Sequence, residues 1–157
     1  MRGRNGIAAL TLLAGVASPV FAADPVHTYS LINASATRID FADEAGHMAK
    51  NGFMTFNILT VLASGSVAYS MSEVSIHCAS SRIATISNAN YAANGSLLPT
   101  ETLDTAPQPI TPGTLGQALH LVICTGVDPY PRSKSIKGAD RALAKARDLF
   151  ATLQAAK

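Results

Sequence analysis

The strongest strand signal in the chain lies at residues 53–62, ten residues rich in Phe, Ile, Val and Thr. Its apolar side chains fall on both faces of an extended strand, which predicts a central strand that is covered on both sides. The turn-forming run Ser64-Gly65-Ser66 separates it from a second strand predicted at residues 67–77. Because so short a connection joins antiparallel strands, the chain is constrained to form an antiparallel sheet.

Other strand-like segments flank this pair. Composition and turn residues predict strands at residues 26–32, 36–41 and 82–88. Asn94-Gly95, within residues 91–98, is typical of a hairpin with a two-residue type I′ turn. Four prolines between residues 98 and 114 exclude a helix or a central strand, so that stretch is expected to be a surface loop. The sequence therefore predicts a meander of about five to six antiparallel strands.

Two helices are predicted in the last third of the chain. Residues 114–123 suit a short helix that begins after Thr114 and leads into Cys124. Residues 128–137 begin with Asp-Pro-Tyr-Pro and are expected to form a semi-rigid linker. Apolar residues then recur at helical spacing over residues 138–157, which predicts a C-terminal amphipathic helix. The expected fold class is α+β.

Residues 1–22 have the organisation of a secretory signal peptide. Two arginines precede an apolar stretch, and a small-x-small pattern ends at Ala22, where we expect cleavage. An uncleaved membrane anchor is the alternative, but Pro19 and Asp24 interrupt the stretch before about 20 apolar residues. The mature chain is thus expected to be exported to the periplasm or the cell surface without a transmembrane segment. The expected organisation is a signal peptide at 1–22, a domain at 23–127, a linker at 128–137 and a basic helix at 138–157.

Cys78 and Cys124 are the two cysteines of the chain. In an oxidising compartment they can pair only with each other, so a disulfide is expected. It would close a loop of about 47 residues, which the chain-entropy treatment equates with about 4 kcal/mol of stability. A redox role or a metal site is disfavoured, because the spacings Cys-x2-Cys and His-x3-His are absent.

Charge divides the exported chain into an acidic part and a basic part. Residues 23–127 carry three basic and seven acidic residues, whereas residues 128–157 carry seven basic and three acidic ones. The two parts cancel, which disfavours a nucleic-acid partner. The basic tail is a candidate partner-binding surface for anionic lipid head groups, polyanionic glycans or an acidic protein. Alternatively, the helix docks on its own domain, or on a second copy in a homodimer, and leaves its charges solvated. The candidate binding residues are Arg132, Lys134, Lys137, Arg141, Lys145 and Arg147.

No catalytic or cofactor motif was found in the sequence. The four histidines invite a Ser-His-Asp interpretation, but a Gly-x-Ser-x-Gly turn and a phosphate-binding glycine loop are both absent. His77 lies beside Cys78, and oxidation of that cysteine would remove a Cys-His nucleophile. We therefore expect a non-catalytic protein without a cofactor or a metal, and keep a small periplasmic hydrolase as a distant alternative.

Several segments together resemble the surface-adhesin protein E family over roughly residues 29–124. They are YSMSEVSIHC at 69–78, Ser81-Arg82, Tyr91 with Asn94-Gly95, PGTLG at 112–116, and VIC at 122–124. The resemblance implies a twisted antiparallel sheet with a packed helix, two joined cysteines, and a location in the envelope of a Gram-negative bacterium. It also implies binding of host matrix proteins at the cell surface. The chain departs from the family in its extension at 125–157 and in lacking a lipoprotein cysteine, so a structural or assembly role in the envelope is the alternative.

Overall fold

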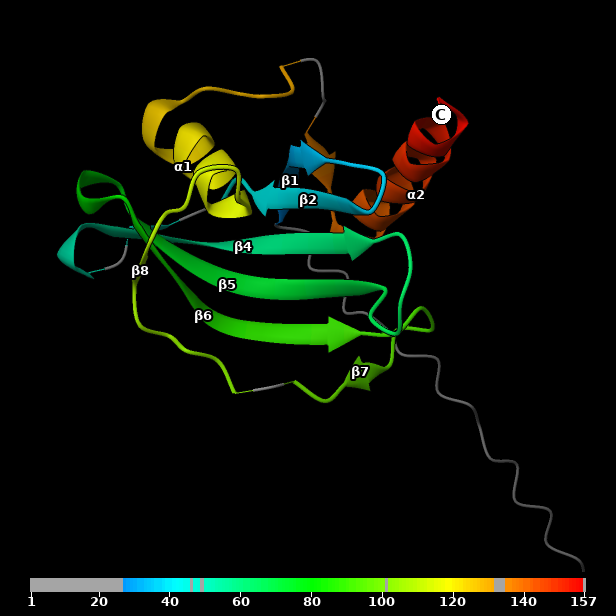
Figure 1. The fold of residues 1–157 in the computed structure, drawn as a ribbon, viewed down its shortest axis with the longest axis horizontal. Helices are drawn as coiled ribbons and strands as arrows, with labels where there is room; N and C mark the ends of the chain where they lie inside the picture. The colour runs from blue at the N-terminus through cyan, green and yellow to red at the C-terminus, as the bar shows by residue number, and fades with distance from the viewer. Residues whose placement is uncertain (1–26, 46, 49, 101, 132–134, 157) are drawn as a thin grey trace, which may run out of the picture.

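The computed structural model describes residues 27–45, 47–48, 50–100, 102–131 and 135–156 (Figure 1). The predicted signal peptide at 1–22 and its cleavage site lie outside these residues. The fold is α+β, as predicted: an antiparallel sheet carries two α-helices. No helix in the described part of the chain has the length and apolar content that a membrane span requires.

Five long strands form the body of the sheet, in the order β6-β5-β4-β2-β1. Consecutive long strands pair antiparallel, which confirms the predicted meander. Four two-residue strands add to this body: β3 pairs with β4 beyond the end of β2, β7 and β8 pair with the edge strand β6, and β9 pairs with the edge strand β1. The bounds are β1 Thr28–Ala34, β2 Arg38–Asp43, β3 His47–Met48, β4 Phe53–Leu62, β5 Tyr69–His77, β6 Arg82–Tyr91, β7 Leu97–Leu98, β8 Gln108–Pro109 and β9 Ile136–Lys137. The helices are α1 Leu115–Thr125 and α2 Ala139–Ala155, with short 3-10 turns at Lys50–Gly52 and Cys78–Ser80.

Two turns differ from the sequence-based prediction. Strands β1 and β2 each begin and end two residues later than expected, because the Ser35 hydroxyl accepts the backbone N–H of Arg38 and places the turn at 35–37. The prediction of a type I′ turn at Asn94-Gly95 is wrong. Only Gly95 has a positive φ, and Gly95 N–H bonds to the carbonyl of Ala92 while Ala92 N–H bonds to that of Ser96. This pattern is a type I turn followed by a left-handed residue.

The two helices cover opposite faces of the sheet. Side chains alternate along β4, so Phe56 and Ile58 pack with Leu119 of α1, whereas Leu59 and Val61 pack with Phe150 of α2. The helices also lie at opposite ends of the strands (Figure 1). Each helix therefore covers one end of its face, and β4 is the central, doubly covered strand that its composition predicts.

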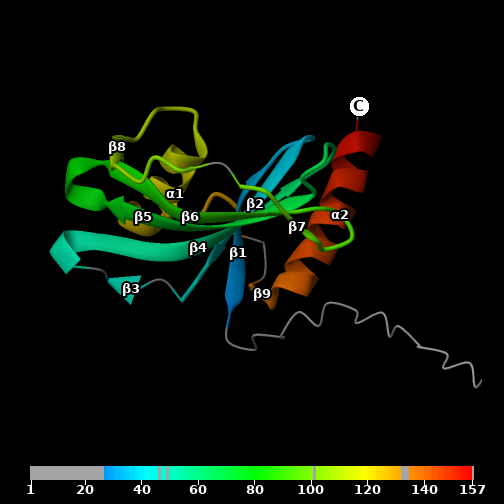
Figure 2. The same ribbon diagram turned by 90° about the horizontal axis from the view of Figure 1, so that it is seen from below.

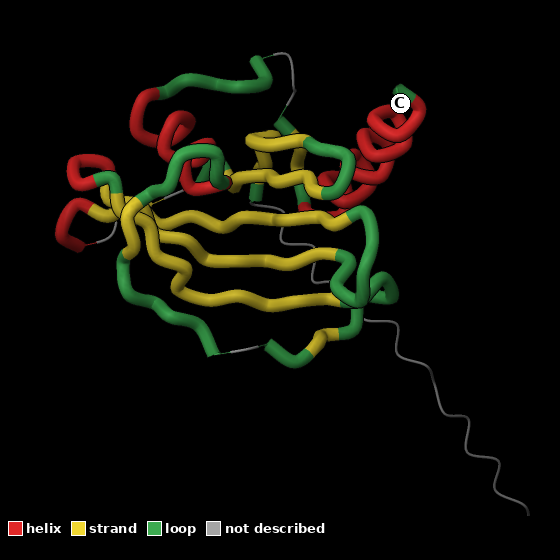
Figure 3. The backbone as a smooth tube through the Cα atoms, viewed as in Figure 1, coloured by secondary structure: helices red, strands yellow, loops and turns green. Residues whose placement is uncertain are grey.

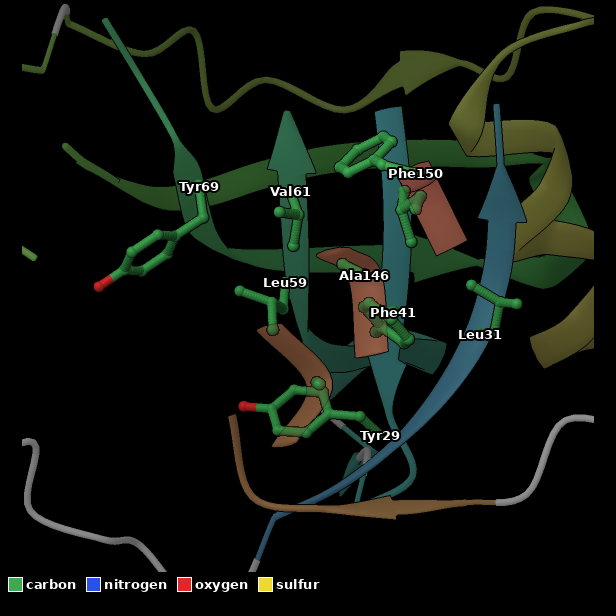
Figure 4. Packing of buried hydrophobic residues seen from close by; sticks show 10 residues of the cluster. Tyr29, Leu31, Phe41, Leu59, Val61, Tyr69, Ala146 and Phe150 are labelled. Carbon is green, nitrogen blue, oxygen red and sulfur yellow. The ribbon is translucent and has the colours of Figure 1, made fainter. Parts of the chain in front are cut away.

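Helix α2 docks on its own domain. Ala142 and Ala146 are fully buried and Phe150 is 8% exposed, in a cluster with Tyr29 and Phe41 (Figure 4). The leucines of this helix, Leu143, Leu149 and Leu153, are only partly buried. Alanines carry the closest contact because their small side chains let the helix backbone approach the sheet.

The expected linker at 128–137 is attached to the sheet. The Tyr130 hydroxyl accepts the backbone N–H of Ala34 at 3.0 Å, and β9 pairs with the edge strand β1 next to the start of α2 (Figure 2). Gly138, with a φ of 86°, then turns the chain into the helix, and its N–H bonds to the carbonyl of His27. These contacts determine where α2 starts.

The predicted disulfide between Cys78 and Cys124 is confirmed. Cys78 begins the 3-10 turn after β5, and Cys124 lies in the last turn of α1. The bridge therefore ties α1 to the end of a central strand, whereas α2 is held by packing and hydrogen bonds.

Replacing Phe150 by Ala should lower the free energy of unfolding by about 3 kcal/mol, because it leaves a cavity in the contact between α2 and the sheet. Urea denaturation of the full chain measures this loss. The exposed Gln154, one turn further along the same helix, provides the control, and Gln154→Ala should change stability by less than about 0.5 kcal/mol. Equal effects of both substitutions would contradict the docked position of α2.

Candidate ligand-binding surfaces

The predicted basic residues do not form one surface. Lys137 lies in β9, and Arg141, Lys145 and Arg147 lie on α2, all exposed. Arg132 and Lys134 lie outside the described residues. Because a helix turns 100° per residue, Arg141 and Lys145 share one flank of α2 while Arg147 lies on another.

Three of these cations surround a hollow of about 430 Å³ between α2, β9 and the edge of the sheet. We call it the basic groove. Pairing of β9 with β1 brings Lys137 opposite Thr28, next to the first turns of α2, where Arg141 and Lys145 stand one turn apart. The groove is lined by Leu31, Phe41, Ser135, Ile136, Lys137, Arg141 and Lys145.

The basic groove has an apolar floor and a cationic rim. Leu31, Phe41 and Ile136 contribute hydrocarbon, and the stems of the long basic side chains add to it. Within the described residues, Lys137, Arg141 and Lys145 form no ion pair. The neighbouring carboxylate of Glu44 instead accepts the hydroxyls of Ser30 and Ser135. Such a site suits a ligand with an anionic group and an apolar part.

A second hollow, of about 520 Å³, lies on the opposite face of the sheet beside α1. We call it the polar trough. Side chains of β2, β4, β5 and β6 form its floor, and α1 with the segment around Pro109 forms its wall. Its polar lining residues are Arg38, Thr60, Ser70, Ser72, Thr85, Asn90, Thr111 and Thr114.

A buried carboxylate organises one end of the polar trough. Asp40 is 0% exposed and accepts Nε–H of Arg38 at 2.8 and 2.9 Å, the Thr60 hydroxyl at 2.6 Å and the Asn33 amide at 2.8 Å. This network was not among the sequence-based predictions. The sequence does indicate the contact between Arg38 and Asp40, because the two residues are two positions apart in a strand and so point to the same face.

Asp40→Asn should lower the free energy of unfolding by about 2–3 kcal/mol, because the amide replaces a charged acceptor and directs an N–H group at donors that the carboxylate now accepts. Chemical denaturation at neutral pH gives the value. Asp104→Asn is the control. Asp104 is exposed, and its carboxylate accepts the backbone N–H of Ala106, a bond that an amide oxygen can also accept. This variant should change the free energy of unfolding by less than about 0.5 kcal/mol. A neutral Asp40→Asn variant would be incompatible with the network.

The histidines have local structural contacts. Nδ1 of His77 accepts the backbone N–H of Ser80 at 3.2 Å and caps the 3-10 turn at the disulfide. His27 contacts the carboxylate of Asp43, and Nε2 of His120 lies 3.5 Å from the Ser81 hydroxyl. The side chain of His47 lies outside the described set. Across the part of the chain that the structure describes, no three His, Cys, Asp or Glu side chains gather as metal ligands.

Comparison with protein-family models, with curated proteins and with solved structures found no match to this chain. The candidate sites are therefore defined by their own geometry. Of the sequence-predicted residues, the structure brings Lys137, Arg141 and Lys145 together and separates Arg147 from them.

Proposed function

We propose that this protein is an exported, non-catalytic binding protein whose basic groove holds an anionic amphiphile of the bacterial envelope. One observation carries the proposal: three cations that form no ion pair with any described residue surround a groove with an apolar floor. A purely polyanionic glycan would use the cations alone, and an apolar peptide would use the floor alone. An acidic head group attached to a hydrocarbon chain uses both.

Export is part of the proposal. The signal-peptide pattern at residues 1–22 and the disulfide between Cys78 and Cys124 support a periplasmic or surface location. The resemblance to the surface-adhesin protein E family also supports the proposal. An antiparallel sheet with a packed helix and joined cysteines agrees with that family, and host matrix proteins or glycans then become further candidate partners.

An assembly role in the envelope is the second candidate function. Strand β6 pairs at its two ends with β8 and β7, and no described strand pairs with the outer edge of residues 84–89 between them. Figure 3 shows the connection from β7 to β8 passing beside this edge as a loop. Ile86 and Leu97, which are 43% and 67% exposed, lie on these outer strands. An open edge with exposed apolar side chains suits strand addition by a partner or by a second copy.

The groove is tested by binding of the full exported chain to vesicles. We expect phosphatidylglycerol vesicles to bind and phosphatidylcholine vesicles not to bind. Arg141→Gln should weaken binding about fivefold, the effect of about 1 kcal/mol for one cation near an anionic surface. Arg147→Gln, which removes the same charge from another flank of α2, should leave vesicle binding unchanged. Equal losses of vesicle binding in both variants would mean that the vesicles bind through general charge attraction and not in the groove. Stronger binding to heparin than to the vesicles would favour a glycan as the ligand.

A periplasmic location predicts protection of the native protein from protease added to intact cells, together with its release by osmotic shock. Digestion on intact cells would place it on the surface and favour the adhesin function. Retention in the cytoplasm after both treatments would contradict export. A periplasmic enzyme and a cytoplasmic enzyme of the same cells provide the controls for release and for lysis.

A further inference from the structure

Tyr69 carries a polar atom that the fold leaves without a partner. The residue is only 6% exposed, and within the described residues its hydroxyl is the one buried side-chain nitrogen or oxygen without a hydrogen bond. Its ring stacks on Tyr91 with centroids 4.8 Å apart, so the position of the hydroxyl is well defined. Figure 4 shows this hydroxyl turned away from the labelled aliphatic side chains. Buried polar groups in native proteins are nearly always paired, so the exception requires a reason.

The Tyr69 side chain lines a hollow of about 250 Å³ between α2 and the turn that follows β6. We call it the tyrosine pocket. One side is a face of α2 formed by Asp140, Leu143 and Arg147, which are spaced three and four residues apart. The other side is the turn at Ala93, Asn94 and Gly95. In this turn Asn94 Oδ1 accepts the N–H and the hydroxyl of Ser96, which holds the loop in place.

The charges of the tyrosine pocket are opposite and separate. Asp140 and Arg147 lie two helical turns apart, about 10 Å along the axis, and neither forms an ion pair with another described residue. Burial, with smaller contributions from Tyr91 and Asp140, raises the pKa of Tyr69. Its hydroxyl therefore stays protonated at neutral pH and can both donate and accept a hydrogen bond.

We propose that the tyrosine pocket binds a small zwitterion of the amino-acid class, with its ammonium group at Asp140, its carboxylate at Arg147 and, after a shift of the side chains that cover it in this structure, a hydrogen bond to the hydroxyl of Tyr69. The volume is below the roughly 300–1,000 Å³ of pockets for larger ligands, which limits the occupant to a few non-hydrogen atoms beyond the two charged groups. A ligand with a single charge would match only Asp140 or only Arg147. The site is separate from the basic groove, since the two share no lining residue.

Calorimetric titration of the full exported chain with glycine, glycylglycine and lysine tests the proposal. Acetate and methylammonium, which each carry one of the two charges, serve as ligand controls. The chain has four tyrosines and no tryptophan, so a near-UV difference spectrum reports a new hydrogen bond to a tyrosine hydroxyl without tryptophan background. We expect saturable binding of at least one zwitterion below about 10 mM, accompanied by a tyrosine difference signal.

Tyr69→Phe removes only the hydroxyl and should weaken binding about tenfold, and Arg147→Gln, at an exposed position, should do the same. Asp148→Asn is the control, because Asp148 is exposed on α2 and lines neither hollow beside that helix, and this variant should bind normally. The proposal is overturned if no zwitterion binds, as expected when water alone occupies the pocket. It is also overturned if acetate or methylammonium binds as tightly as the zwitterions, or if binding survives both Tyr69→Phe and Arg147→Gln.

Discussion

Burial of β4 on both faces is the constraint on which the rest of this structure depends. Ile58 is 1% exposed on one face, and Leu59 is 0% exposed on the other. A sheet strand with apolar side chains on both sides is stable only if two separate layers exclude water from it. The chain supplies these layers after the meander is complete, as α1 and then α2. The C-terminal extension is therefore part of the hydrophobic core, because Ala142, Ala146 and Phe150 belong to the same buried cluster as Phe41.

Each helix covers only one end of its face (Figure 1), and this partial cover produces the hollows. The polar trough lies on the sheet face that α1 covers, where that face continues beyond the helix. Hydroxyl and amide side chains replace apolar ones there. On the other face α2 leaves a hollow along each flank. Its close approach through Ala142 and Ala146 places the residues beside the contact, Arg141 and Lys145 on one flank and Asp140 and Arg147 on another, at the rims of two different hollows.

Local patterns in the sequence identify the elements but not the contacts between them. Composition and turn residues identify the strands at 53–62 and 67–77, and helical spacing identifies α2, because these signals lie within one element. The turn after β6 was predicted as the wrong type, since Asn94 bonds to Ser96 instead of adopting a positive φ. Strand β9 is two residues long and carries no pattern, and the tyrosine pocket combines β5, a turn and α2. The division of the basic residues was predictable in part, because helical rotation alone separates Arg141 from Arg147.

The way α2 is held connects its docking to ligand binding. The disulfide secures α1, while the contact of α2 with the sheet depends on packing around Phe150 and on the pairing of β9. Both hollows beside α2 have one wall on the helix and another on the sheet or its turns. A ligand in either hollow contacts both walls and binds the docked state only, so it stabilises that state by an amount that grows with the ratio of its concentration to its Kd. Occupancy of the groove and occupancy of the tyrosine pocket thus favour the same position of α2, and each ligand should raise the affinity for the other to the extent that α2 undocks without them.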